Sequence, residues 1–149
     1  MSDCKWFEYA QLSKEELEAI FELRQRVFVI EQQSIYPDID GLDKSALHLV
    51  MSQKGKMIGY VRLRCLDDAQ CWKIERVLLE EGSRGLGLGD ELIKQTIDKA
   101  QSINNEFDIK LSSQCSAIAF YQRFGFKEKG EVYDDGGIDH IDMIKPSTQ

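Results

Sequence analysis

Three glycines, Gly85, Gly87 and Gly89, separate an apolar run that ends at Leu79 from an amphipathic helical pattern that begins at Leu88. Glycine lets the backbone form turns that other residues resist, and it lets a ligand approach the backbone closely. The first N–H groups of a helix have no partner within the helix and form a binding site for an anion. The segment therefore predicts a strand, a phosphate-binding turn and a helix, in that order.

Two common phosphate-binding motifs do not fit this turn. A P-loop requires Gly-Lys-Ser or Gly-Lys-Thr, but Gly89 is followed by Asp90 and Glu91. A dinucleotide-binding fingerprint requires a third glycine at the position that Leu92 occupies. The turn is thus a phosphate cradle of another type.

The rest of the chain predicts short strands and helices. Ser13 and Glu16 form a capping box before apolar residues at helical spacing, so we expect a helix over Lys14–Val27. Turn-forming residues predict a loop over Glu31–Lys44. Strands are expected at Lys5–Tyr9, Leu47–Met51, Met57–Leu66, Trp72–Leu79, Phe107–Leu111, Lys127–Tyr133 and Ile138–Ile144, a helix at Leu88–Ala100, and a short helix capped by Ser116 and closed by Gly125.

This order of elements predicts an α/β fold of the mixed α+β kind. Its centre is a mostly antiparallel sheet of about six or seven strands, flanked by helices, with one strand–helix–strand crossover at the glycine turn. The chain has 149 residues and no internal repeat. A single domain over residues 1–149 is therefore expected.

Charge and composition argue against several classes of protein. A net charge of −7 provides no basic footprint for nucleic acid. No run of 18 apolar residues and no signal-like start is present, so we expect a soluble, cytoplasmic protein that does not bind membranes. The four cysteines form no C-x-x-C pair and only two histidines are present, so reduced thiols and no metal site are expected.

Two motifs resemble the GNAT superfamily of acyl-CoA N-acyltransferases. Arg84-x-x-Gly87-x-Gly89 is similar to the superfamily's CoA-binding signature, and Ala119–Phe126 resembles its late helix, with Phe-Tyr and Gly-Phe pairs. The segments Leu23–Gln32, Asp38–Asp43, His48, Glu131–Tyr133 and Asp139–Ile141 resemble the ElaA-like subgroup. The resemblance covers nearly the whole chain and implies acetyl-CoA as the co-substrate.

The resemblance implies roles for two adjoining segments. Backbone N–H groups of the turn would hold the CoA pyrophosphate, and the preceding strand would offer backbone groups to the pantetheine arm. One N–H group of that strand would also polarise the thioester carbonyl, as in an oxyanion hole. The turn residues are Arg84, Gly85, Leu86, Gly87, Leu88, Gly89 and Asp90, and the strand residues are Val77, Leu78 and Leu79.

Three residues are predicted to be catalytic. Tyr121 is the candidate general acid, because it matches the superfamily's late helix and a phenol is protonated at neutral pH. Glu75 is a candidate general base, since strand alternation is expected to place it on one face with Val77 and Leu79. His48 is a further candidate base, with His140 as an alternative, because an imidazole accepts protons near neutral pH. Ordinary structural roles fit both histidines and Glu75 equally well.

The acceptor is expected to be a primary amine, on a small molecule or a peptide. Four carboxylates, those of Glu31, Asp38, Asp40 and Asp43, fall within thirteen residues, with Lys44 as the one nearby cation. The resemblance places this loop beside the acceptor cleft, and a cleft of one charge concentrates ions of the other. A cationic amine is therefore predicted. The expected acceptor-binding residues are Arg24, Phe28, Glu31, Asp40 and His140.

Direct attack of the amine on acetyl-CoA in a ternary complex is the leading mechanism, because proximity supplies much of the rate. Two alternatives remain. The chain could be a non-catalytic acyl-CoA-binding or sensor protein, or an acyl-homoserine-lactone-type synthase, which the spacing of Arg24, Phe28 and Glu31 suggests. The acyl chain length and a homodimeric state stay open.

Overall fold

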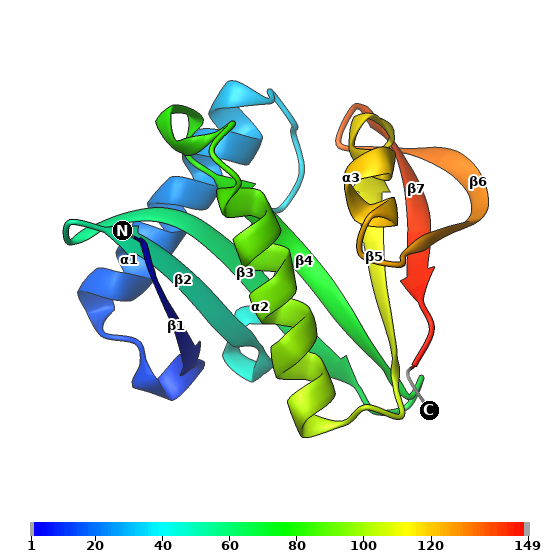
Figure 1. Cartoon of the computed structure of the whole chain (residues 1–149). Coiled ribbons are helices and arrows are strands. Elements are labelled where there is room, and N and C mark those ends of the chain that lie inside the picture. The colour runs from blue at the N-terminus through cyan, green and yellow to red at the C-terminus, as the bar shows by residue number, and fades with distance from the viewer. Residues whose placement is uncertain (1, 148–149) are drawn as a thin grey trace.

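A single seven-stranded sheet forms the centre of the computed structural model, which describes residues 2–147 (Figure 1). The strands are ordered β1-β2-β3-β4-β5-β7-β6. All neighbours are antiparallel except β4 and β5, which are parallel and joined by a helical crossover. The strands are β1 Ser2–Glu8, β2 Leu47–Gln53, β3 Lys56–Leu66, β4 Cys71–Leu79, β5 Asp108–Gln114, β6 Lys127–Asp135 and β7 Ile138–Lys145. The expected mixed, mostly antiparallel sheet is confirmed.

The first helix, α1 (Lys14–Arg24), begins at the predicted capping box. The Ser13 hydroxyl accepts a hydrogen bond from the Glu16 N–H at 3.0 Å, and the Glu16 carboxylate accepts one from the Ser13 N–H at 2.8 Å. The helix then widens into a π-helical segment, η2 (Gln25–Glu31), instead of ending at Val27. Isolated π-helical turns occur mostly at functional sites.

Two further helices follow the sheet's central strands. The helix α2 (Leu88–Ile103) starts at the glycine turn and provides the crossover from β4 to β5. The helix α3 (Ile118–Gln122) follows a 3-10 turn, η5 (Cys115–Ala117). The expected cap by Ser116 is wrong, because Ser116 lies inside that turn and Ala117 precedes the helix without a side-chain cap. Shorter 3-10 turns are η1 (Tyr9–Gln11), η3 (Asp43–Ser45) and η4 (Glu81–Ser83).

The sheet buries a different core on each face. Leu92 and Ile93 of α2 pack with Tyr121 of α3 against one face. Ile20 and Leu23 of α1 pack against the other, together with the η2 residues. In Figure 1, α2 crosses one side of the sheet while α1 lies on the opposite side. Among residues 2–147, no helix combines the length and the apolar character needed to span a membrane.

The parallel pairing of β4 and β5 stops halfway along the strands. Its register runs from Cys71↔Asp108 to Ile74↔Leu111, although β4 continues to Leu79. Figure 1 shows the two strands close together at one end and separated at the other. The second half of β4 therefore has one backbone edge that makes no ladder with β5.

A β-bulge interrupts β4 where the two strands begin to separate. Arg62 of β3 pairs with Glu75, but Tyr60 pairs with Leu78, so one β3 residue faces both Arg76 and Val77. Arg76 has a φ of 56°, in the left-handed region that a non-glycine residue enters at a cost.

The bulge reverses the side-chain alternation that the sequence predicted for β4. Val77 and Leu79 pack against the core on the α2 side, whereas Leu78 lies in the core on the α1 side. Glu75 pairs with Arg62, on the α1 side. The prediction that Glu75 shares a face with Val77 and Leu79 is therefore wrong, because the extra residue shifts the pattern by one.

Candidate active site

A cavity of about 710 Å³ lies where β4 and β5 separate. Gly89, Leu92, Phe120 and Tyr121 line it on the α2 side of the sheet. Glu75 lines it on the other side, together with residues of η2 and of the β6–β7 hairpin. The cavity thus connects both faces of the sheet, and two substrates can meet in it from opposite directions.

The glycine turn lies exposed at the start of α2. Gly85 and Gly87 have φ values of 79° and 78°, which glycine adopts without strain. Gly87 is the N-cap of α2 and provides no side-chain cap, so the first N–H groups of this helix of 16 residues face outward. This arrangement fits an anion such as a pyrophosphate. Gly89 lines the cavity, whereas Gly85, Leu86, Gly87, Leu88 and Asp90 lie outside it.

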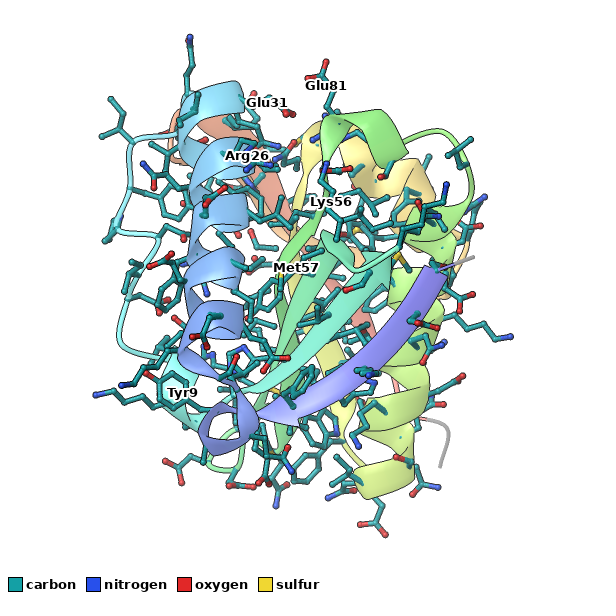
Figure 2. All side chains as sticks on the ribbon, turned by 90° about the vertical axis from the view of Figure 1, so that its left-hand side faces the viewer. Tyr9, Arg26, Glu31, Lys56, Met57 and Glu81 are labelled. Carbon is teal, nitrogen blue, oxygen red and sulfur yellow. The ribbon has the colours of Figure 1, made fainter. Side chains whose placement is uncertain are left out.

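Arg84 ties the turn to the end of the π-helical segment. Its guanidinium donates to the Leu79 carbonyl from Nε at 3.1 Å and from Nη2 at 2.9 Å. Its Nη1 lies 2.6 Å from the Glu31 carboxylate. Figure 2 shows Glu31 at the same end of the molecule as Glu81, which lies on the connection after β4. Arg84 therefore fixes both the end of β4 and the neighbouring wall.

Val77, Leu78 and Leu79, the strand residues before the turn, all line the cavity. Their side chains contribute to the two cores, so the groups that they can offer to a ligand belong to the backbone. A strand edge with unpaired N–H and C=O groups binds an extended ligand as an added strand would. The Leu79 carbonyl is the exception, because Arg84 already occupies it.

Tyr121 is nine per cent exposed and lines the cavity from the short helix α3. Phe120 and Phe126 pack edge-on against its ring, with centroids 5.0 and 6.0 Å away. Burial raises the pKa of the Tyr121 phenol to about 12. The hydroxyl therefore stays protonated at neutral pH, as a general acid requires.

The acidic loop does not form a negatively charged cleft. Arg24 is fully buried and lies 3.0 Å from Asp38 and 2.6 Å from Asp43. Arg62 is also fully buried and lies 2.8 Å from Asp40 and 3.2 Å from Asp43. Since Glu31 is paired as well, every one of the four carboxylates faces an arginine.

The premise of a cationic acceptor is therefore wrong. The arginines come from α1 and from strands far away in the sequence, where a count of charges near the loop does not find them. Burial opposes ionisation of Asp40, but the hydrogen bonds from Arg62 and the charge of Arg76 outweigh it and hold its pKa well below the usual range. Asp40 lines the cavity as part of this network, which we call the arginine–carboxylate network: Arg24, Arg62, Arg64, Arg76, Asp38, Asp40, Asp43 and Glu75.

Glu75 lines the cavity but is heavily paired. Arg64 lies 2.6 Å and Arg62 3.0 Å from its carboxylate. Burial alone would raise the pKa of Glu75, but the hydrogen bond from Arg64 and the charge of Arg62 lower it below its ordinary value. This environment makes the carboxylate a weak proton acceptor.

His48 does not line the cavity, and its side chain is fully buried. Its Nε2 donates to the Asp43 carbonyl at 2.8 Å, and its Nδ1 accepts from the Tyr60 hydroxyl at 2.5 Å. Burial lowers the pKa of the imidazole. The prediction that His48 is a catalytic base is wrong on this geometry, because both ring nitrogens are occupied and neither is accessible to a substrate.

The predicted acceptor residues divide into two groups. Phe28, Asp40 and His140 line the cavity, whereas Arg24 and Glu31 do not and pair with other side chains. The expectation that Arg24 and Glu31 contact the acceptor is therefore corrected to a structural role. Within residues 2–147, no cluster of three His, Cys, Asp or Glu side chains is arranged to hold a metal ion.

Several residues that line the cavity or support its wall were not predicted from the sequence. Arg76 is held by Asp38 at 2.9 Å and lies over the Tyr36 ring at 5.2 Å. Gln114 of β5 donates to Gln32 at 3.1 Å, which links the residue after the π-helical segment to the sheet. Arg62 and Arg64 alternate with apolar residues on the expected strand Met57–Leu66, and that pattern is a usable signal, since an arginine that the sheet buries needs a carboxylate partner.

Comparisons with known proteins agree with this geometry. The sequence profile of the acetyltransferase (GNAT) domain family matches residues 8–146. Protein ElaA of Escherichia coli is 34% identical over 144 residues, which cover 95% of this chain and 94% of ElaA. Its crystal structure superposes with a TM-score of 0.92 at 32% identity and covers 97% of this chain and 99% of that one.

An acyl-CoA N-acyltransferase from Pseudomonas aeruginosa gives a similar result. Its crystal structure also has a TM-score of 0.92, at 33% identity, over 97% of this chain and 99% of its own. The synthase LasI shares the fold with a TM-score of 0.75, but at 17% identity. The chain therefore belongs to the GNAT acetyltransferase family of acyl-CoA-dependent enzymes, and within that family it is ElaA-like.

Proposed function

We propose that this protein transfers an acetyl group from acetyl-CoA to a primary amine, with both substrates bound at once. The observation that carries the proposal is the cavity that crosses the sheet between β4 and β5. CoA binds from the α2 side, with its pyrophosphate at the glycine turn and its pantetheine arm along the free edge of β4. The amine enters from the α1 side, so the thioester and the nucleophile meet inside the sheet.

Tyr121 is the general acid of this reaction. Its hydroxyl opens into the cavity on the CoA side, and no hydrogen-bond partner occupies it among residues 2–147. As the C–S bond breaks, the phenol gives its proton to the departing sulfur. An N–H group in the second half of β4 stabilises the negative charge that forms on the thioester oxygen.

The acceptor is an amine on a small molecule or a peptide. Because arginines pair with the carboxylates of the acidic loop, the loop does not favour a cationic acceptor over a neutral one. The cation Lys73 and the carboxylate Asp135 both line the cavity. Four free cysteines fit a reducing compartment, so we place the protein in the cytoplasm.

The proposal is tested by release of free thiol from acetyl-CoA. We expect release above the acceptor-free rate with one or more members of a panel that contains spermidine, the common amino acids and short peptides with free N-termini. Mass spectrometry then shows one acetyl group on the amine. Propionyl-, butyryl- and octanoyl-CoA, assayed in parallel, test the acetyl preference. Tight CoA binding with no thiol release from any acyl-CoA would instead indicate a sensor.

We expect Gly89→Val to weaken CoA binding at least tenfold, or about 1.4 kcal/mol. A Cβ at Gly89 would lie 3.6 Å from the Phe120 ring and 3.8 Å from the Leu79 side chain, both ordinary contacts, so the helix accepts it. The two valine methyls then enter the cavity on the CoA side. Isothermal titration calorimetry with CoA measures the change.

Gly82→Val is the matched control. Gly82 lies on the same connection between β4 and α2, and a Cβ there meets nothing within 4 Å. Gly87 is less suitable for this test, because its φ of 78° makes any larger residue strained. Equal CoA affinity in Gly89→Val and wild type would remove the cavity from the CoA-binding site.

A further inference from the structure

His140 lines the cavity from β7, and its neighbours hold its orientation. It lies on β7, opposite Gln114 of β5 and Tyr133 of β6. The Tyr133 ring stacks on the imidazole with centroids 6.3 Å apart and planes at 26°. The Tyr133 hydroxyl donates to Asp142 at 2.6 Å and also contacts the Ser112 hydroxyl. Three strands therefore fix the plane of the imidazole.

A hydrogen bond also fixes the tautomer of His140. Its Nδ1 lies 2.7 Å from the Ile138 carbonyl oxygen. A carbonyl can only accept a hydrogen bond, so Nδ1 carries the hydrogen. A neutral imidazole has one N–H group, and Nε2 therefore holds a free lone pair. Among residues 2–147, no side chain or backbone group hydrogen-bonds Nε2.

Other basic groups near the acceptor side are less available. Glu75 is paired with Arg62 and Arg64, and Asp40 is paired with Arg62 and Arg76. The His48 side chain is fully buried, and both of its ring nitrogens make hydrogen bonds. Of the residues already named as candidate bases, His140 therefore combines a place in the cavity lining with a basic atom, Nε2, that has no hydrogen-bond partner among residues 2–147.

We propose that Nε2 of His140 accepts the proton that the acceptor amine must lose before it attacks. This inference rests on the acyl transfer proposed above. The acceptor ammonium gives one proton to Nε2, and the freed lone pair forms a C–N bond with the thioester carbon. The C–S bond breaks, and the sulfur takes the Tyr121 proton. The acceptor nitrogen, now bonded to the acyl carbon, loses its second proton to Tyr121, so the products are an amide, free CoA thiol and a protonated His140, which then releases its proton to solvent.

The placement of the two groups supports this division. Tyr121 lines the cavity on the α2 side, where CoA binds in the proposal. Ile141, the neighbour of His140, is buried in the α2-side core, so alternation along β7 directs His140 to the α1 side. The acid is thus on the side of the leaving thiol, and the base is on the side of the incoming amine. The charged or titratable groups that face His140 or share its side of the cavity include Tyr36, Tyr133, Asp135, Asp142, Lys73, Glu75, Arg76 and Asp40.

The test uses His140→Asn, because the asparagine amide keeps a donor near the Nδ1 position and removes the basic Nε2. With the fastest acceptor of the amine panel, we expect kcat to fall by about 10²–10⁴ while the Kd for CoA stays unchanged. A reaction that depends on a general base has a kcat/KM that rises with pH in the wild type. That limb should vanish in the variant, and added imidazole should restore part of the rate. The matched control is Asp139→Asn, because Asp139 is exposed and directly precedes His140. This variant should keep the wild-type pH profile of kcat/KM.

A second measurement does not need an acceptor. The chain has only two histidines, and the structure gives them opposite neutral tautomers: N–H on Nε2 in His48 and on Nδ1 in His140. Nitrogen-15 NMR of histidine-labelled protein should show both tautomers, and the signals of the Nδ1–H tautomer should vanish in His140→Asn.

The outcomes separate this inference from the proposed function. If wild type releases thiol with an amine but His140→Asn has the same rate and pH profile, His140 is not the base and the acyl transfer stands. If NMR shows the Nε2–H tautomer for His140, the inference is likewise overturned. If wild type binds CoA and transfers no acyl group, the proposed function fails, whatever the histidine spectrum shows.

Discussion

Turnover of the Tyr121→Phe variant is expected to be about 10²–10⁴ times lower than that of the wild type, the range typical of a lost general acid. The ring is nine per cent exposed and packed edge-on by Phe120 and Phe126. Phenylalanine preserves that packing, so the substitution removes the hydroxyl alone. The Kd for CoA should stay within about twofold, because the proposed CoA contacts are with the backbone of β4 and the turn.

The measurement is single-turnover acyl transfer, so that product release does not mask the chemical step. Tyr9→Phe is the matched control, since Tyr9 lies in η1, outside the cavity, and Figure 2 shows it at the far end of α1 from Glu31. That variant should react like the wild type. A Tyr121→Phe enzyme with undiminished single-turnover rate would reduce Tyr121 to a packing residue.

Arg62→Met is expected to lower the free energy of unfolding by about 3–5 kcal/mol, as for the removal of one partner from a buried ion pair. Arg62 is fully buried and contacts Asp40, Asp43 and Glu75 within 3.2 Å. Methionine fills much of the space but removes one arginine partner from each of these three carboxylates. Urea denaturation at pH 7 measures the change from the midpoint and slope.

Arg26→Met is the control, because it makes the same substitution at an arginine whose side chain is exposed to solvent. Arg26 pairs with Glu22 at 2.5 Å, but the two side chains are 50% and 66% exposed. Exposed pairs of this spacing contribute about 0.3–0.5 kcal/mol. A comparable loss in both variants would show that the arginine–carboxylate network adds nothing beyond an ordinary surface pair.

The same network predicts how stability depends on acidity. The pKa values of Asp40 and Glu75 are lower in the folded protein than their ordinary values. Below about pH 4, the unfolded chain therefore binds protons that the folded protein does not, and stability falls as the pH decreases. Arg62→Met should flatten this dependence, because it removes one cause of both shifts.

The sequence predicted the sheet, its crossover and the glycine turn because these depend on local patterns. Gly85 and Gly87 take left-handed backbone angles, and Ser13 caps its helix as its spacing requires. The bulge at Arg76 was not predicted, because it arises from how β3 and β4 pair and from the contacts of Arg76 with Asp38 and Asp40. A shift of one residue then changed the face assigned to Glu75.

Local motifs identified two residues that line the cavity, Tyr121 and Gly89. Their catalytic and CoA-binding roles stay predictions. The acidic loop was misjudged because the partners of its carboxylates come from other elements. Arg62, for example, lies 19 residues beyond Asp43 in the sequence and 3.2 Å from it in the fold. Charge compensation of this kind is a tertiary property, and local spacing carries no information about it.

The short pairing of β4 with β5 has a consequence for how the protein responds to its substrates. Four residue pairs, Cys71↔Asp108 to Ile74↔Leu111, join the first four strands to the last three in the ladder. Beyond Ile74, the amides of β4 on that edge have no strand to shield them, so they should exchange hydrogen with solvent readily in the free protein. In the proposed complex, a pantetheine arm along this edge would take the place of a missing strand, so substrate binding should slow amide exchange along this seam and hold the two parts of the sheet together more tightly.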